Sequence, residues 1–264
     1  MKKIQLDDCT INVIDEGEGK PILFVHGFPL DHRMWREQRT SFSSNYRVII
    51  PDLRGFGKSG VTEGTVSMAQ FADDLNKILT ELKVYEPVVY CGLSMGGYIA
   101  WEFARRYPER LSGLIVCDSK ALPDSDDTRQ TRQHSATELR ENGTDNVVFA
   151  MMPKMFGMTT RAENKKLVEE FRQMMLDANP EGMAAGQLGM ADRADATTFL
   201  SDINVPTLLI GGEEDIISPV LEMQEISNKM PHAQFVEIPK AGHLAPLEKP
   251  VEVNDAIRKF IDQL

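Results

Sequence analysis

The pattern Gly-x-Ser-x-Gly centred on Ser94 is the part of the sequence best suited to covalent chemistry. It lies in Gly92-Leu93-Ser94-Met95-Gly96-Gly97, after the apolar run 88–91 and before a helical stretch at 98–107. A serine on such a strand-to-helix turn exposes its hydroxyl above the sheet, and glycines two positions to either side let the chain turn tightly. The pattern therefore predicts Ser94 as a nucleophile.

A serine hydroxyl needs a base within hydrogen-bonding distance, normally a histidine oriented by a carboxylate. His243 follows the predicted strand 234–238, so we expect it at the carboxyl edge of the sheet, on the same side as Ser94. The other histidines fit less well: His26, expected to brace its loop by hydrogen bonds; His32, expected at the surface; His134, in a polar segment; and His232, expected at the opposite edge. The sequence therefore favours His243 as the base.

Two aspartates are candidates for the acid that orients the histidine. Asp215 follows the predicted strand 207–210 through a short loop, and the chain order Ser, Asp, His is the one that this strand-turn-helix architecture uses. Asp118 ends the predicted strand 114–117 at the same edge and is the alternative, while Glu213 and Glu214 are interpreted as solvated neighbours. We favour Asp215.

Attack on a carbonyl leaves negative charge on its oxygen, which two preorganised backbone N–H groups can stabilise. The amide of Met95 should be one donor, because it begins the helix after the nucleophile. The second must come from the loop His26-Gly27-Phe28-Pro29. Pro29 has no N–H, so Phe28 is the expected donor.

The elements that must position these residues alternate between strands and helices. The short apolar runs typify parallel strands covered on both faces. A helix capped by Ser67 carries Phe71, Leu75 and Ile78 on one stripe, with Asp73 and Asp74 expected outward. The alternation predicts an α/β fold, a mostly parallel doubly wound sheet with helices on both faces.

The alternation stops between about 120 and 200. We expect a helical cap, or lid, at 120–200 inserted into a core made of 1–119 and 201–264. The cap holds eight of the fourteen methionines, which suit either a deformable pocket lining or ordinary core filling. Arg129 and Arg132 are candidates to receive a substrate carboxylate, although a solvated basic turn is the simpler interpretation.

Charge and composition exclude several other classes of protein. The formal net charge of −11 over 264 residues argues against a nucleic-acid partner. No apolar stretch is long enough for a signal peptide or a membrane span, and the three cysteines fit packed, reduced thiols, so we expect a cytoplasmic protein. There is no phosphate-binding loop and no metal-ligand motif, so we expect no cofactor and no metal. The oligomeric state stays open.

The sequence resembles the α/β-hydrolase superfamily over nearly its whole length outside the cap. The resemblance rests on segments 25–32 (VHGFPLDH), 52–59 (DLRGFGKS), 91–97 (CGLSMGG), 108–111 (PERL) and 241–244 (AGHL), together with Asp215. The segment around Ser94 most resembles 3-oxoadipate enol-lactonases and small carboxylesterases. Epoxide hydrolases and haloalkane dehalogenases of this fold carry an aspartate at the equivalent of position 94, so Ser94 argues against both.

The resemblance implies a catalytic triad of Ser94, Asp215 and His243, with an oxyanion hole from Phe28 and Met95. It predicts a serine hydrolase for carboxylic esters or lactones, most simply a carboxylesterase acting on a small molecule. An enol-lactonase, a carbon–carbon bond hydrolase and a perhydrolase would use the same residues. A small-molecule sensor is the alternative from a different class.

Overall fold

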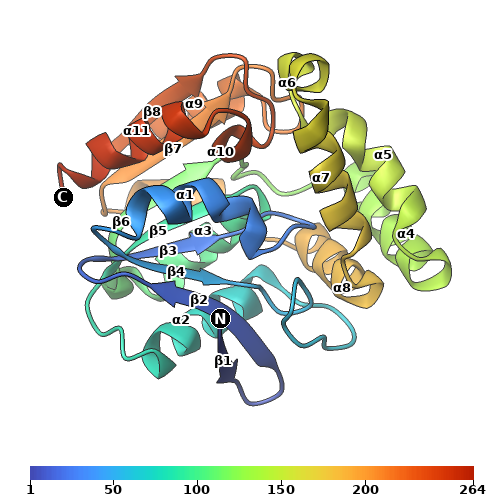
Figure 1. The fold of residues 1–264 in the computed structure, drawn as a ribbon, viewed down its shortest axis with the longest axis horizontal. Coiled ribbons are helices and arrows are strands. Elements are labelled where there is room, and N and C mark those ends of the chain that lie inside the picture. The colour runs from blue at the N-terminus through green and yellow to red at the C-terminus, as the bar shows by residue number, and fades with distance from the viewer.

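The computed structural model describes residues 1–264, which fold around one eight-stranded sheet (Figure 1). The strand order is β1-β2-β4-β3-β5-β6-β7-β8, and all pairs are parallel except β1 with β2 and β2 with β4. The strands are β1 (Lys2–Gln5), β2 (Thr10–Glu16), β3 (Pro21–Val25), β4 (Arg47–Pro51), β5 (Val88–Leu93), β6 (Leu111–Cys117), β7 (Thr207–Gly212) and β8 (Ala233–Ile238). The predicted α/β class and mostly parallel sheet are confirmed.

Helices cover both faces of this sheet (Figure 1). The pairs α1 with α11 and α2 with α3 pack against each other. These core helices are α1 (Arg36–Phe42), α2 (Met68–Glu81), α3 (Met95–Arg106), α9 (Val220–Asn228), α10 (Ala245–Glu248) and α11 (Pro250–Ile261).

Five further helices follow β6 and precede β7, and they lie together at one end of the sheet (Figure 1). We call them the inserted helices: α4 (Asp126–Asn142), α5 (Asp145–Met155), α6 (Met158–Glu163), α7 (Lys165–Leu176) and α8 (Pro180–Ala191). Helices α6 and α7 are separated at Asn164, whose side chain accepts the N–H of Leu167 and caps α7.

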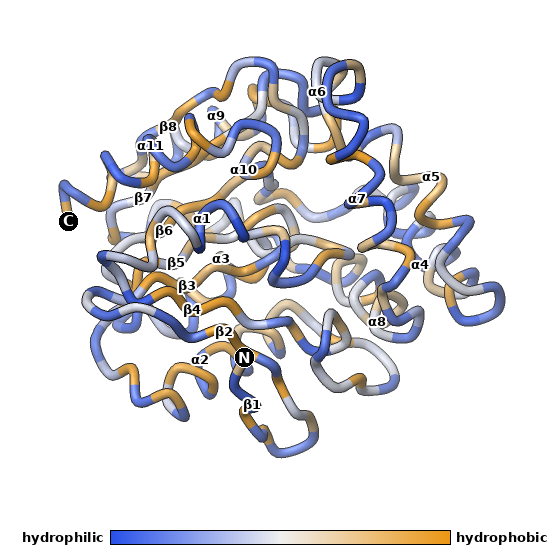
Figure 2. The backbone as a smooth tube through the Cα atoms, viewed as in Figure 1, coloured by the Kyte–Doolittle hydropathy of each residue, from blue (hydrophilic) through white to orange (hydrophobic).

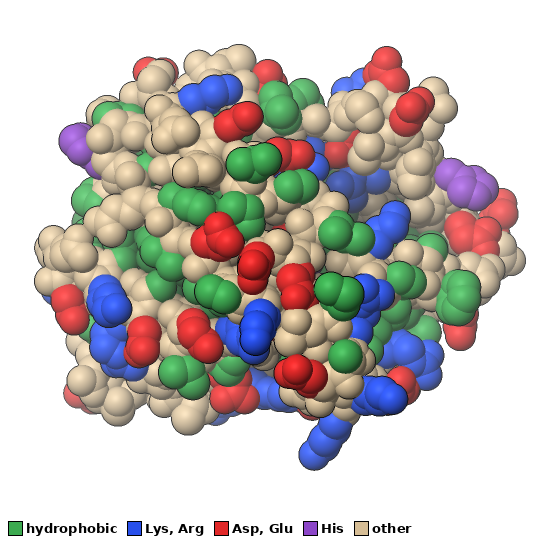
Figure 3. All heavy atoms as spheres, turned by 90° about the horizontal axis from the view of Figure 1, so that it is seen from above, with side chains coloured by type: hydrophobic (Ala, Val, Ile, Leu, Met, Phe, Trp, Pro, Cys, Tyr) green, Lys and Arg blue, Asp and Glu red, His purple; other side chains and the backbone are tan.

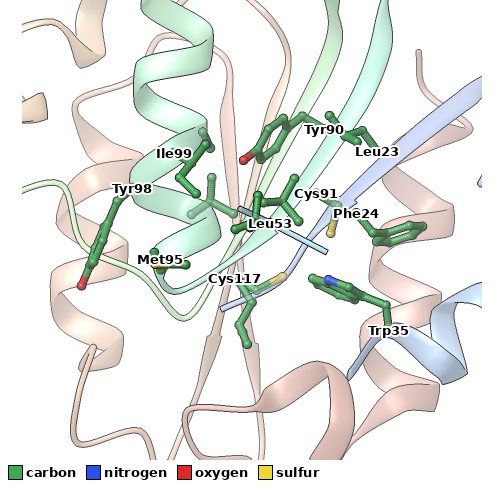
Figure 4. Close-up of a cluster of buried hydrophobic side chains, with 14 of the residues drawn as sticks. Leu23, Phe24, Trp35, Leu53, Tyr90, Cys91, Met95, Tyr98, Ile99 and Cys117 are labelled. Carbon is green, nitrogen blue, oxygen red and sulfur yellow. The ribbon is translucent and has the colours of Figure 1, made fainter. Parts of the chain in front are cut away.

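The apolar core lies on both faces of the central strands, whose tube is mostly orange in Figure 2. All five residues of β3 and all six of β5 are buried, as expected for parallel strands covered by helices. Figure 4 shows part of this core, in which side chains of β3 and β5 lie near Met95 and Ile99 of α3. The rings of Phe24 and Trp35 pack there with centroids 5.1 Å apart.

Helix α2 confirms most of its predicted pattern and corrects one residue. Ser67 caps it by accepting the N–H of Gln70, and the predicted apolar stripe is buried. Asp74, expected outward, is instead only 2% exposed. Its two carboxylate oxygens each accept a hydrogen bond of 2.8 Å from the Arg54 guanidinium. The helical pattern did not reveal this partner because Arg54 arrives from the loop after β4.

The surface mixes acidic and basic side chains, as Figure 3 shows for one face. The three cysteines, Cys9, Cys91 and Cys117, are buried and unpaired. None of the helices combines the length and the apolar character that crossing a membrane requires.

Candidate active site

Ser94 occupies a strained turn between β5 and α3. Its backbone has φ 51° and ψ −108°, a region that costs an L-residue conformational energy and is held only by the surrounding structure. A Cβ at Gly92 would lie 2.4 Å from the carbonyl oxygen of Gly96, and a Cβ at Gly96 would lie 2.4 Å from that of Val25. Both glycines are therefore required by close backbone contacts, as the motif predicts.

His243 lies beside Ser94 because β5 and β8 both end at the same edge of the sheet. Its Nε2 is 2.8 Å from the Oγ of Ser94, and its Nδ1 is 2.8 Å from the Oδ2 of Asp215. His243 is 3% exposed and Asp215 5% exposed, whereas Ser94 is partly exposed. With the proton on Nδ1, the imidazole donates to Asp215 and accepts from Ser94.

The carboxylate of Asp215 is held by the backbone of its own loop. Its Oδ1 accepts the N–H groups of Ile217 at 2.7 Å and Ser218 at 3.1 Å, which leaves Oδ2 for His243. Burial alone would raise the pKa of Asp215, but His243 and these two amides outweigh burial and hold that pKa below its ordinary value. Asp215 is therefore ionised and oriented.

Asp118, the alternative acid, has other partners. Its Oδ1 accepts the N–H of Gly212 at 2.8 Å, and its Oδ2 accepts the N–H of Ala245 at 3.1 Å. Complete burial and the nearby charge of Asp215 raise the pKa of Asp118. This carboxyl group makes no hydrogen bond to His243 and instead ties the end of β7 to the loop that follows His243.

Two backbone amides stand where the sequence expects donors for an oxyanion. Val25 pairs with Gly92 in the sheet, which sets the loop after β3 beside the Ser94 turn. The N–H of Phe28 makes no hydrogen bond within the protein. Met95 is the first residue of α3, and N–H groups in the first turn of a helix have no intrahelical acceptor. Neither N–H group therefore has a hydrogen-bond acceptor within the protein.

The remaining histidines hold the neighbouring loops or lie away from Ser94. His26 is fully buried, and its Nε2 accepts the N–H of Leu53 at 2.9 Å, which confirms the expected bracing role. The expectation of a surface position for His32 is wrong: its Nδ1 lies 2.7 Å from Asp52, and its side chain is 15% exposed. His232 is at the opposite edge, where its carbonyl accepts the N–H of Thr207.

Asp31, His32 and Asp52 lie close enough to share one metal ion. Their ligand atoms are already used within the protein, however. The carboxylate of Asp31 accepts hydrogen bonds from Arg33, and that of Asp52 accepts the backbone N–H groups of His32 and Lys58. The cluster therefore acts as a hydrogen-bonded brace for the loop after β3.

A cavity of about 880 Å³ lies between the inserted helices and the core. Phe28 and Tyr98 form part of its core side, and Ile216 and Ile217, from the loop that carries Asp215, form another part. Tyr98 lies one helical turn after Ser94, and although neither Ser94 nor His243 lines the cavity, the cavity lies beside the Ser94 turn and extends toward the inserted helices.

Arg132 lines this cavity, but Arg129 does not. Arg132 donates through Nε to Asp124 at 2.5 Å and through Nη1 to Gln187 at 3.0 Å, whereas its Nη2 makes no hydrogen bond within the protein. Asp124 is also paired with the buried Arg193 at 2.6 Å. Two guanidinium groups therefore share one carboxylate, and this wall of the cavity has an excess of one positive charge.

The methionines of the inserted helices are mainly core residues. Met174, Met175, Met183 and Met190 are at most 4% exposed. Of the eight methionines, only Met151 and Met155 line the cavity. Core filling accounts for most of the methionine content, and the deformable lining is limited to these two side chains.

Sequence reasoning missed three charged residues near the site: Asp124, Arg193 and Glu248. Asp124 and Arg193 flank the inserted segment, and no local pattern shows that they meet. Glu248 follows His243 by five positions, and its carboxylate accepts the N–H groups of Gly242 and Leu244. The short separation between Glu248 and the predicted catalytic histidine was the one feature of the sequence from which a role for Glu248 could have been predicted.

Comparisons with known proteins identify the family to which this fold belongs. The family model described as the alpha/beta hydrolase fold matches residues 20–250. The chain is 28% identical over 257 residues to 3-oxoadipate enol-lactonase 1 of Acinetobacter baylyi, covering 97% of this chain and 94% of that protein. It is 29% identical to the AB hydrolase superfamily protein YisY of Bacillus subtilis, with 96% of each chain covered.

A solved structure extends this likeness to three dimensions. The thermophilic esterase from Thermogutta terrifontis, solved with malate bound, is 42% identical and superposes with a TM-score of 0.97. The match covers 100% of this chain and 99% of that one. With the family model matching most of its length and the sheet order described above, the chain belongs to the α/β-hydrolase family.

Proposed function

We propose that this protein is a serine hydrolase that cleaves carboxylic esters or lactones, and most simply a carboxylesterase. The observation that carries the proposal is the pair of 2.8 Å contacts that His243 makes, one to Ser94 and one to Asp215. Nucleophile, base and orienting acid thus form one hydrogen-bonded chain, and that chain has the order needed for acyl transfer.

In the first half-reaction, the Oγ of Ser94 attacks the substrate carbonyl carbon while Nε2 of His243 takes the hydroxyl proton. Asp215 keeps the imidazole oriented and stabilises its positive charge. The N–H groups of Phe28 and Met95 receive the negative charge that develops on the carbonyl oxygen. The bond to the leaving oxygen then breaks, and His243 returns its proton to that oxygen.

In the second half-reaction, water replaces the alcohol. His243 removes a proton from the water as it attacks the acyl-enzyme, and then protonates the Oγ of Ser94 as the acid is released. Every proton is returned within the cycle, so ester hydrolysis at this site consumes only water. In a lactone, the leaving oxygen stays attached to the acyl chain and the same steps apply.

Turnover of short p-nitrophenyl esters tests the proposal. Ser94→Ala is expected to lower kcat/KM by about four to six orders of magnitude, because the residual rate would come only from binding and the oxyanion donors. Ser119→Ala is the control, since the Ser119 hydroxyl donates to the carbonyl oxygen of Ser94 at 2.8 Å without meeting His243. It should stay within about tenfold of wild type. Near-normal turnover in Ser94→Ala would refute the proposal.

The same assay separates an enzyme from a small-molecule sensor. Sustained turnover is expected for the enzyme, whereas a single round of labelling without a steady state would favour the sensor. A panel of esters and lactones of graded acyl length then defines the substrate.

A lactonase acting on a carboxylate-bearing substrate is the second candidate. It is favoured by Arg132 in the cavity wall, with its Nη2 unused, and by the likeness to an enol-lactonase. Carbon–carbon bond hydrolysis and perhydrolysis would use the same triad, and no cavity residue selects them. In each case we propose that 120–200 acts as a cap over a core of 1–119 and 201–264.

A further inference from the structure

Glu248, the last residue of α10, lies between the active site and the inserted helices. Its Oε1 accepts two backbone N–H groups, from Gly242 at 3.0 Å and Leu244 at 3.1 Å. These are the residues on either side of His243. Its Oε2 accepts the N–H of Gly157 at 2.9 Å, in the turn before α6. One carboxylate therefore joins the flanks of His243 to the inserted helices.

The two bonds to Oε1 act on the direction of the imidazole. The N–H groups of the residues before and after His243 both point toward the same oxygen, which restrains the backbone from which its side chain projects. His243 needs such a constraint, because its Nε2 must stay 2.8 Å from the Oγ of Ser94. A displacement of about 1 Å in such a site can cost about 100-fold in rate.

The segment that carries His243 also lies in close contact with the inserted helices. A Cβ placed on Gly242 would lie 2.0 Å from the backbone nitrogen of Gly157, so the two chain segments touch at backbone level. Glu214 supports the same junction: it accepts the N–H of Thr159 at 2.8 Å and the hydroxyl of Thr159 at 2.5 Å. The side chain of Glu214 makes no hydrogen bond to the N–H groups of Gly242 and Leu244.

We propose that Glu248 is a positioning residue for His243, acting through the amides of Gly242 and Leu244, and that Glu214 only fastens the inserted helices. The proposal rests on the function proposed above. Burial raises the pKa of Glu248, while the hydroxyl of Thr160 and the three amides oppose the rise. Ionised, the carboxylate accepts all three N–H groups. A glutamine of the same size would turn a donor NH₂ toward at least one of them and leave it unpaired.

The test compares Glu248→Gln with two other glutamate-to-glutamine variants. Glu214→Gln weakens the contact with Thr159 of the inserted helices and leaves the N–H groups beside His243 with their Glu248 acceptor. Glu213→Gln is the matched control, because Glu213 also accepts one loop amide, that of Lys240 at 2.8 Å, but contacts neither His243's flanks nor the inserted helices. For each protein, kcat and KM are measured on a neutral ester, together with the rate constant at which phenylmethanesulfonyl fluoride labels Ser94.

Glu248→Gln should lower kcat and the labelling rate constant together, by about tenfold or more, with KM within about twofold of wild type. The other two variants should label at the wild-type rate. The rate constant reports folded molecules only, since unfolded protein reduces the labelled fraction and not the rate. Should Glu248→Gln not accumulate, Glu248→Asp keeps the charge on a shorter side chain and is expected to show the same slowing.

Two results would overturn the inference. One is labelling of both Glu248→Gln and Glu248→Asp at the wild-type rate, since a glutamine alone could keep its carbonyl oxygen on Gly242 and Leu244 and turn its NH₂ toward Gly157. The other is an equal slowing in Glu214→Gln, which would assign the effect to attachment of the inserted helices. Failure of the wild-type protein to be labelled at Ser94 would instead refute the proposed function, so the two failures are distinguishable.

Discussion

Asp118 and Asp215 follow the neighbouring strands β6 and β7, but only Asp215 contacts His243, with its Oδ2 2.8 Å from the Nδ1 of His243. Asp118 is fully buried and accepts amides from β7 and from the segment after His243. The two carboxylates thus divide two tasks. One faces the imidazole, and the other joins the end of β7, which leads to Asp215, to the segment that follows His243.

Asp215→Asn should lower kcat by about three to four orders of magnitude, because an amide can donate to Nδ1 and so stabilise the wrong imidazole tautomer. Steady-state ester hydrolysis measures the effect. The loss should appear in kcat, with KM little changed, because Asp215 is not expected to touch substrate. A variant within tenfold of wild type would show that another group orients His243.

Asp118→Asn should act mainly on stability. The amide NH₂ would face an N–H donor from Gly212 or Ala245, leaving one buried group unpaired at a cost of about 1–3 kcal/mol. Chemical denaturation measures this cost, and kcat at a temperature where the variant is folded should fall less than tenfold. A loss of activity as large as that of Asp215→Asn, with unchanged stability, would give Asp118 the orienting role.

The ion pair between Arg54 and Asp74 predicts a large stability effect. Both side chains are 3% exposed, and without Asp74 the buried Arg54 guanidinium keeps only the exposed Asp8 as a charged partner, through Nη1 at 2.7 Å. Asp74→Ala should therefore lower the free energy of unfolding by about 3 kcal/mol, the lower end of the cost of breaking a buried pair. The control is Asp73→Ala, which removes the partly exposed pair with Arg106 and the bond from the Tyr107 hydroxyl and should cost about 1 kcal/mol. Equal effects of the two substitutions would contradict this reasoning.

The proximity of the three proposed triad residues follows from local patterns in the sequence. Ser94 sits between a strand and a helix, while Asp215 and His243 each follow a strand. Because parallel strands end at one edge, three separate local patterns were enough to bring these side chains together. The helical stripe of α2 is likewise local, and its apolar residues are buried as expected.

The failures share another cause. Asp74 and His32 both looked solvent-facing within their own segments, but each meets a charged partner delivered by the loop after β4, Arg54 or Asp52. The pairing of Asp124 with Arg193 likewise joins residues at the two ends of the inserted segment. Periodicity reports which face of an element is apolar and carries no information on which distant charge arrives there.

Asp15 in β2 provides a pH-dependent prediction. Its side chain is 4% exposed and receives hydrogen bonds from Arg47 at 2.8 Å and Lys2 at 2.6 Å. Burial opposes ionisation, but these two cations outweigh burial and hold the pKa of Asp15 below its ordinary value. A carboxyl group with a lowered folded-state pKa stabilises the fold above its unfolded pKa, and this contribution is lost as the pH falls through the folded pKa.

Asp15→Asn should therefore cost about 1–3 kcal/mol at pH 7, and the difference from wild type should shrink below about pH 4. Urea denaturation at pH 7 and pH 3 measures both values. Asp7→Asn is the control, since Asp7 pairs with Lys77 but its side chain is 87% exposed. That variant should change stability by less than about 1 kcal/mol at either pH. A cost for Asp15→Asn that is the same at both pH values would contradict the assigned ionisation.

Arg132 and Arg129 were equivalent candidates in the sequence, and the cavity separates them. Arg132 lines the cavity with Nη2 unused, beside an Asp124 carboxylate that it shares with Arg193. Arg129 instead donates to the carbonyl oxygen of Ala191, outside the cavity lining. If the substrate carries a carboxylate, Arg132→Ala should lower kcat/KM for an anionic ester or lactone by about tenfold, the value of one charge-assisted hydrogen bond.

The comparison that isolates charge uses two esters of the same size, one ending in a carboxylate and one in a methyl amide. Arg132→Ala should reduce kcat/KM for the anionic ester and leave the neutral ester within about twofold, because the neutral ester carries no charge for the guanidinium to bind. Arg129→Ala should leave both esters unchanged. Equal losses on both esters in Arg132→Ala would mean that Arg132 supports the cavity wall only through packing, and a neutral acyl group would then become the better description of the substrate.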